Sequence, residues 1–106
     1  MEYLNKITIR GQVGAVRTTE VQGRTLTRMS VATQEVYKDG NNPMVVEITW
    51  HNVEGWDREG MKLSDTAKGD KVYVEGRLKA QRYTNAEGHE SQVYSIIASK
   101  FEKVTD

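Results

Sequence analysis

Five stretches of this sequence alternate apolar and polar side chains, which is the pattern of strands that bury one face. Between the third and fourth stretches, the segment Asp57–Lys68 lacks this alternation and predicts a short helix that ends before Gly69. Residues typical of turns and loops separate the other stretches, at 21–24, 38–43 and 85–88. The predicted strands are, in chain order, about Leu4–Val13, Thr25–Tyr37, Met44–Val53, Lys71–Tyr83 and Glu90–Val104.

Glycines near or inside these strands indicate that the strands bend. Gly11 and Gly14 mark a bend or bulge in the first strand, and Gly76 marks another in the fourth. An open sheet of five long strands exposes its edges, whereas closure into a barrel removes most of them. We therefore predict an all-β fold: a five-stranded Greek-key barrel of the OB-fold type, with the short helix between the third and fourth strands. At 106 residues, the chain is expected to form one such domain over residues 1–106.

Composition and motifs exclude several classes of function. The chain has no cysteine, which excludes disulfides and thiolate metal sites. Its two histidines, His51 and His89, are far apart in the sequence and have no partner at metal-ligand spacing. There is no serine nucleophile elbow, HExxH motif or phosphate loop. We predict a protein that is not an enzyme and uses no metal, cofactor or small-molecule substrate. No apolar run is long enough to span a membrane, so a cytoplasmic location is expected.

Aromatic and cationic residues occur together near the ends of the predicted strands. The rings are Tyr37, Trp50, Trp56 and Tyr83, and the nearby cations are Lys38, Arg58 and Arg82. Flat rings beside positive charge suit a single nucleic-acid strand, because its bases stack and its phosphates need neutralisation. Each ring taken alone is as compatible with a place in the core. The prediction of a binding surface therefore depends on the four rings together.

The charge of the chain gives opposing indications. The net charge is zero, with 15 basic and 15 acidic residues, whereas nucleic-acid binders usually carry a basic excess. The basic residues nevertheless cluster in the first quarter and in the fourth predicted strand, so we expect a basic face and an acidic face. Alternation places Arg77, Lys79 and Tyr83 on one face of that strand. This face is a candidate track for a phosphate backbone, and the alternative is an ordinary solvated strand face.

The third predicted strand has a face that is both polar and aromatic. Trp50, Asn52 and Glu54 share it, with Trp56 just beyond the end of the strand, so this face is not expected to be core. The same rule does not place Tyr37, because its parity matches that of strand residues expected to be buried.

Several segments resemble, in order, the bacterial single-stranded DNA-binding proteins. The opening Asn5–Gly14 is similar to that family's first strand, and Val31–Asp39 is similar to the end of its second. Trp50–Val53 is similar to the family's third-strand Trp-His motif, and Lys68–Leu78 resembles its fourth strand most specifically. The likeness extends over about residues 4–104. It implies single-stranded DNA as the partner, bound without sequence preference in replication, recombination or repair.

The resemblance also implies roles for individual residues. Tyr37, Trp50, Trp56 and Tyr83 fall at family positions that carry aromatic rings, and in the family these rings stack on bases. Assembly as a homo-dimer or homo-tetramer is implied too, with His51 at a subunit contact; the alternative for His51 is an ordinary strand residue. The predicted nucleic-acid-binding set is Tyr37, Trp50, Trp56, Tyr83, Lys38, Arg10, Arg77, Lys79 and Arg82.

Three features depart from the family pattern and keep a second function open. No Gly/Pro/Gln-rich tail with an acidic tip is expected, since the sequence ends at Lys103–Asp106. Residues 55–68 match the family helix poorly. Ala15–Arg17 replaces the acidic-proline step that follows the first strand in the family. These departures predict a short, divergent, tail-less member. The alternative function is an OB-fold adaptor that docks protein partners, or a primosome-type accessory protein that binds DNA weakly. A carbohydrate-binding module ranks last, because its rings would need flanking carboxylates and amides more than cations.

Overall fold

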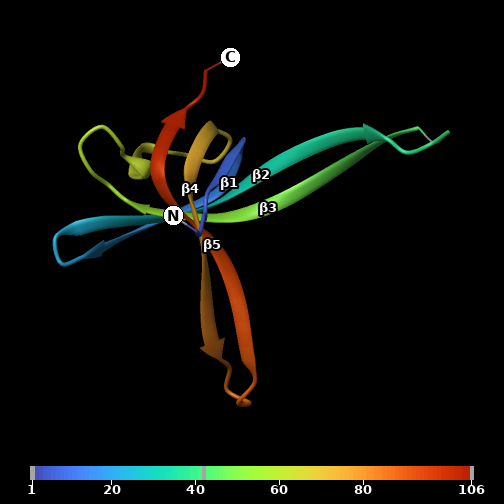
Figure 1. The fold of residues 1–106 in the computed structure, drawn as a ribbon. Helices are drawn as coiled ribbons and strands as arrows, with labels where there is room; N and C mark the ends of the chain where they lie inside the picture. The colour runs from blue at the N-terminus through green and yellow to red at the C-terminus, as the bar shows by residue number, and fades with distance from the viewer. Residues whose placement is uncertain (1, 42, 106) are drawn as a thin grey trace.

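The structure is a barrel of five long strands from which three hairpins project (Figure 1). It is a computed structural model and describes residues 2–41 and 43–105, so Asn42 of the predicted 38–43 loop and the terminal Asp106 lie outside the described residues. Its elements are β1 (Ile7–Val21), β2 (Arg24–Lys38), β3 (Met44–Trp56), the 3-10 turn η1 (Leu63–Asp65), β4 (Lys71–Thr84) and β5 (Glu90–Lys103). The all-β class and the short helical element between the third and fourth strands are confirmed.

The strand order around the barrel is β1-β2-β3-β5-β4, which is the predicted Greek-key closure. β1 closes the barrel on one side, because its first half pairs with β4 and its second half pairs with β2. A short parallel contact between β3 and β5 closes the other side, through the pairs Val53↔Ile96 and Glu54↔Ile97. The register shifts between Val13 and Ala15 and between Glu75 and Gly76, so the predicted bulges are present.

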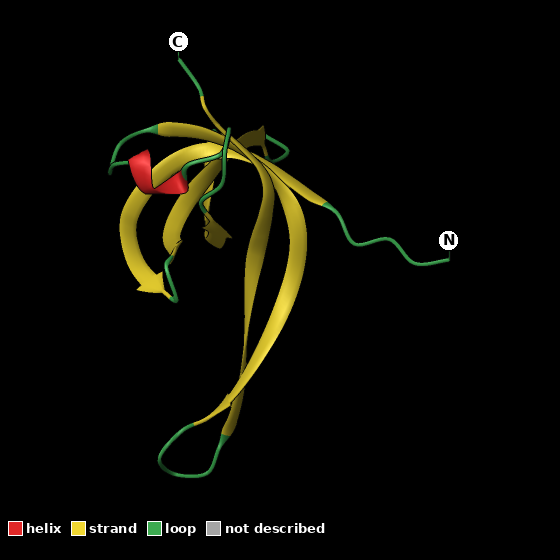
Figure 2. Cartoon of the chain, turned by 90° about the vertical axis from the view of Figure 1, so that its left-hand side faces the viewer, coloured by secondary structure: helices red, strands yellow, loops and turns green. Residues whose placement is uncertain are grey.

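The core lies inside the barrel, and the segment between β3 and β4 covers one of its ends. The buried apolar side chains are Ile9, Val13, Met29, Val31, Val53, Met61, Leu63, Val72, Val74, Ile96 and Phe101. Leu63, in the red helical turn of Figure 2, is fully buried. Burying a leucine stabilises a fold by about 1.5–3 kcal/mol. A single helical turn is therefore enough to cap the barrel, although the sequence predicted a helix somewhere in a longer segment.

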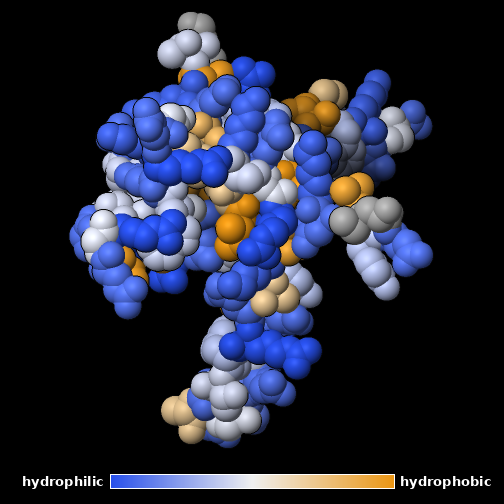
Figure 3. Space-filling model, turned by 60° about the vertical axis from the view of Figure 1, so that its left-hand side comes forward, coloured by the Kyte–Doolittle hydropathy of each residue, from blue (hydrophilic) through white to orange (hydrophobic). Residues whose placement is uncertain are grey.

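The hairpins extend well beyond the barrel. β2 and β3 stay paired as far as Lys38↔Met44, and β4 and β5 as far as Thr84↔Glu90. The radius of gyration is 16.2 Å, whereas a compact chain of this length has about 13 Å. Hydrophilic side chains cover most of the face drawn in Figure 3. The projecting strands thus provide surfaces that the core does not use.

The first strand is longer than predicted because its second half belongs to a projecting hairpin. β1 continues from the bulge to Val21 and turns back through Gln22 and Gly23. Both turn residues have positive φ, 50° and 79°, as in the tight two-residue turns that match the twist of antiparallel strands. Outside the barrel these residues have no buried face, so the alternation used to predict strands disappears there.

Candidate nucleic-acid interface

The outer face of β3 carries both tryptophans. Successive strand residues point to opposite sides, and Val53 is buried in the core. Trp50, Asn52, Glu54 and Trp56 therefore point outward, and we call this set the outer face of β3. Their cross-strand partners on β2 lie on the same side, since directly opposed residues share a face. The predicted polar-aromatic face is thus on the outside of the barrel.

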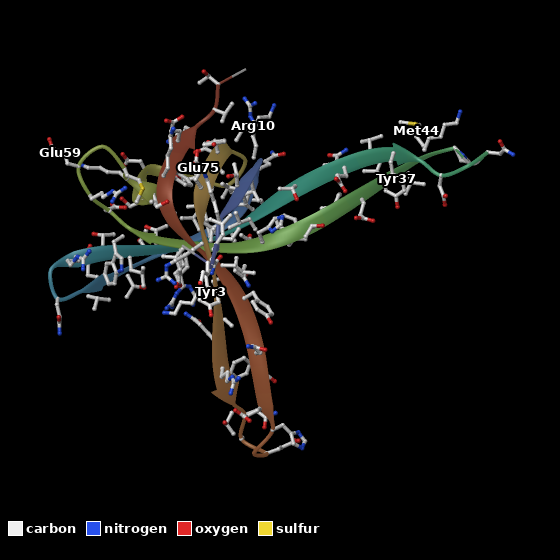
Figure 4. The ribbon with its side chains drawn as sticks, viewed as in Figure 1. Tyr3, Arg10, Tyr37, Met44, Glu59 and Glu75 are labelled. Carbon is white, nitrogen blue, oxygen red and sulfur yellow. The ribbon has the colours of Figure 1, made fainter. Side chains whose placement is uncertain are left out.

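Trp50 lies on a glycine and borders a groove. A Cβ built on Gly14 would stand 2.5 Å from Cζ3 of Trp50, so a glycine is what allows the indole to lie across β1. Trp50 as a residue remains 59% exposed. It lines a groove of about 590 Å³ together with Arg10 and Lys68, among other residues of β1, β2 and the loop before β4. Figure 4 shows Arg10 on the part of β1 near the top of the barrel. The structure thus brings two of the predicted binding residues, Arg10 and Trp50, to one groove.

Trp56 lies at the other end of this face in a different environment. It is half-buried beside Leu26, its cross-strand partner on β2. The guanidinium carbon of Arg24 is 4.4 Å from the centroid of its ring, which is a cation–π geometry. One face of the indole is thus already occupied. Sequence reasoning missed Arg24, because only the register between β2 and β3 shows that it lies beside Trp56.

Cations continue along the same side of the barrel on both flanks of β3. Arg28 is opposite Glu54 on β2, and Arg17 is opposite Arg28 on β1. On the other flank, Glu54 pairs with Ile97 of β5, which pairs with Arg77 of β4. These five residues form one row across the five strands. Neither Arg17 nor Arg28 was predicted as a site residue. The clustering of basic residues in the first quarter of the sequence was the one feature that could have indicated them.

The predicted stripe on β4 faces the same region. Lys79 pairs with Ser95, and Gln81 lines a second groove with Asn52 and Arg28. Tyr83, which shares the parity of Lys79, lies further out on the projecting hairpin and is 52% exposed. Side chains of the β4–β5 hairpin thus border this second groove together with Asn52 and Glu54 of the outer face of β3.

Other predicted residues lie elsewhere. Tyr37 is on the opposite face of the β2–β3 hairpin from Trp50, opposite Val45, and its hydroxyl donates to Glu47 at 3.5 Å. Figure 4 shows it on the distal part of that hairpin, near Met44. Lys38 is at the tip, opposite Met44.

Arg82 and His51 also lie away from the outer face. Arg82 alternates with Lys79 and Tyr83, so it is on the other face of β4. His51 points to the inner side of β3, where its Nε2 atom is 2.8 Å from Oγ1 of Thr33.

The shifted pKa values belong to a pair on β4 that is separate from this groove. The Tyr73 hydroxyl donates to the Glu75 carboxylate, which raises the pKa of Tyr73 and lowers the pKa of Glu75. Glu75 also faces Lys6 and Lys100, whose charges lower its pKa further, whereas desolvation opposes the shift. This pair has no place in the chemistry of the outer face.

Within residues 2–41 and 43–105, no three His, Asp or Glu side chains are grouped so that they could hold a metal ion. In the same ranges, no helix is long and apolar enough to cross a membrane.

Comparison with known proteins gives relatives over nearly the whole chain. The single-stranded DNA-binding protein of Neisseria meningitidis serogroup A is 34% identical, and the match covers 92% of this chain. That of Xanthomonas campestris is 34% identical and covers 93% of this chain. The chain spans 58% and 59% of the length of these two relatives.

Solved structures show the same fold. A Plasmodium falciparum SSB in complex with ssDNA superposes with a TM-score of 0.87 at 27% identity, covering 99% of this chain and 98% of that one. A small single-stranded DNA-binding protein from Streptomyces coelicolor, at 22% identity, shares the fold with a TM-score of 0.74 and covers 93% of each chain. The model of the single-strand binding protein family matches residues 4–104. The chain therefore belongs to the single-strand binding protein family.

Proposed function

We propose that this protein binds single-stranded DNA without sequence preference, in replication, recombination or repair. The observation that carries the proposal is the exposed Trp50 ring in a groove beside Arg10, on the same outer face as Trp56. Family membership and the similarity to a protein solved with ssDNA support the same function.

The chemistry of the outer face accounts for binding without sequence preference. Trp50 offers a flat surface on which any base can stack, because every base has a π-face. Arg10, Arg77 and Lys79 neutralise phosphates and release counterions, so affinity is expected to fall as salt rises. A duplex is expected to bind poorly, because its bases are already stacked and paired and cannot reach the rings.

Fluorescence anisotropy of labelled oligo-dT, repeated over a range of salt concentrations, tests this proposal. We expect binding at low salt, a steep decrease of log K with log salt, and weaker binding of a duplex of equal length. The adaptor alternative predicts little binding of oligo-dT at any salt concentration. Equal affinity for duplex and single strand would contradict base stacking as the mechanism.

We further propose that copies of the chain assemble as a homo-dimer or homo-tetramer that is cytoplasmic and does not act as an enzyme. Family membership supports assembly. His51, the predicted subunit contact, is partly buried within its own chain, where Thr33 is its hydrogen-bonding partner. Light scattering coupled to size-exclusion chromatography measures the mass directly, and a monomer at micromolar concentration would contradict assembly. Cell fractionation tests the location.

A further inference from the structure

Glu54 is a carboxylate in the middle of a surface that is otherwise suited to phosphates. On the outer face of β3 it is the one charged side chain, since the others from Met44 to Trp56 at this parity are apolar, aromatic or amide. It is two residues from Trp56 and four from Trp50, or about 7 and 13 Å along the strand. A single strand that follows β3 from one ring to the other therefore passes it.

The carboxylate holds a cation that could otherwise contact a phosphate. Oε2 of Glu54 is 3.0 Å from Nε of Arg28, and this is a hydrogen-bonded ion pair. The Glu54 side chain is only 13% exposed, whereas that of Arg28 is 62% exposed. The arginine is thus accessible to a ligand, whereas the carboxylate is mostly covered.

The neighbouring strands give this carboxylate an unusual position. Arg17 lies next to Arg28 on one side, and Arg77 lies two strands away on the other, in the same row as Glu54. Because the Arg28 side chain is largely exposed, water screens the ion pair and reduces its contribution to folding stability. A carboxylate among arginines does, however, lower the positive potential that a phosphate backbone experiences.

We propose that Glu54 is an internal competitor of the nucleic acid: it occupies Arg28 in the free protein and limits the affinity of the outer face for single strands. A phosphate that reaches Arg28 has to replace the carboxylate. This inference depends on the proposed function, and it identifies a residue that tunes that function.

The test is the affinity of Glu54→Gln for oligo-dT, measured by anisotropy over a range of salt concentrations. Glutamine keeps the shape and removes the charge. We expect affinity at low salt to increase several-fold, to about 3–10 times that of the unmodified protein, and log K to fall more steeply with log salt by about 0.7, the value for one additional phosphate contact on a single strand. Glu54→Thr, which introduces a good strand former, provides a second uncharged variant if the first unfolds.

Two further variants separate competition from general charge effects. Glu47→Gln removes the same charge from the opposite face of β3 and should leave affinity within about twofold, because Glu47 lies beside Tyr37 and not beside Arg28. In an Arg28→Gln background, Glu54→Gln should raise log K for oligo-dT by less than half as much as it does when Arg28 is present. The reason is that the cation for which Glu54 and the phosphate compete is then absent.

Each remaining outcome overturns the inference. An unchanged affinity of Glu54→Gln, an equal gain in Glu47→Gln, or a full gain in the Arg28→Gln background would exclude competition through Arg28. If the unmodified protein binds oligo-dT and Glu54→Gln binds equally, only this inference fails. If neither binds at low salt, the proposed function fails with it.

Discussion

The two tryptophans of β3 share a strand and a face but have different surroundings. Trp50 lies on Gly14, is 59% exposed and borders an open groove with Arg10. Trp56 is half-buried, with Arg24 stacked on its ring at 4.4 Å. The first ring is free to accept a base, whereas the second is already engaged on one side.

This difference shows that the neighbouring strand, and not the residue type, determines what each ring can do. A glycine at the β1 bulge leaves space for Trp50, and an arginine after the β1–β2 turn covers Trp56. We therefore expect Trp50 to contribute mainly to binding, and Trp56 to contribute to both binding and stability.

The largest expected effect is that of Trp50→Ala. Stacking of a base on an aromatic side chain contributes about 1–3 kcal/mol, which corresponds to a decrease in oligo-dT affinity of about 5- to 150-fold. The melting temperature should change little, because the ring is mostly exposed. Anisotropy and thermal denaturation of the same preparation measure both quantities. Unfolding of this variant would show that the ring stabilises the fold instead.

Gly14→Ala should have the next largest effect, because it acts on Trp50 through the space beneath the ring. The new methyl group would overlap Cζ3, so the exposed indole has to move. We expect affinity to decrease by about threefold or more, with a shift in tryptophan emission. Gly14 does not have a positive φ, so alanine is compatible with the backbone there. An unchanged affinity would show that the position of Trp50 on β1 is unimportant.

A smaller effect on oligo-dT affinity is expected for substitution of Trp56. Trp56→Ala should decrease affinity less than Trp50→Ala and lower the unfolding free energy by about 1 kcal/mol, since the ring is half-buried. A double-mutant cycle with Arg24→Gln isolates the contact between the two side chains, for which we expect a coupling of about 0.5–1 kcal/mol in stability. A coupling of zero would mean that Arg24 does not hold the ring.

The smallest expected effect distinguishes the two faces of β4. Lys79→Gln should reduce the salt dependence of log K by about 0.7, as expected for one lost phosphate contact. Arg82→Gln removes the same charge from the other face of the strand and should leave the slope unchanged. The reverse result would place the DNA on the opposite face of this hairpin.

Much of the fold could be predicted from the sequence because the barrel strands bury one face. Alternation located parts of all five strands, and the glycines located the bulges at 13–15 and 75–76. Prediction failed for the second half of β1, where residues up to Val21 project into solvent and no burial pattern exists. It was also inexact between β3 and β4, because burial of Met61 and Leu63 requires only one helical turn.

The candidate site was less predictable, because it depends on contacts between strands. Alternation was sufficient to place Trp50 and Trp56 on one face of β3, and Lys79 and Tyr83 on one face of β4. It gave no information on Arg24, whose contact with Trp56 depends on the register between β2 and β3. Tyr37 has the parity of buried residues, yet it is 44% exposed because its hairpin has left the barrel.

The most direct test of base stacking on Trp50 uses a variant in which Trp50 is the only tryptophan. The chain has two tryptophans, so Trp56→Phe leaves Trp50 as the single reporter. We predict that oligo-dT quenches its fluorescence at low salt and that added salt reverses the quenching. Undiminished Trp50 fluorescence at oligo-dT concentrations that saturate anisotropy would show that the strand binds without stacking on this ring, and would contradict the account.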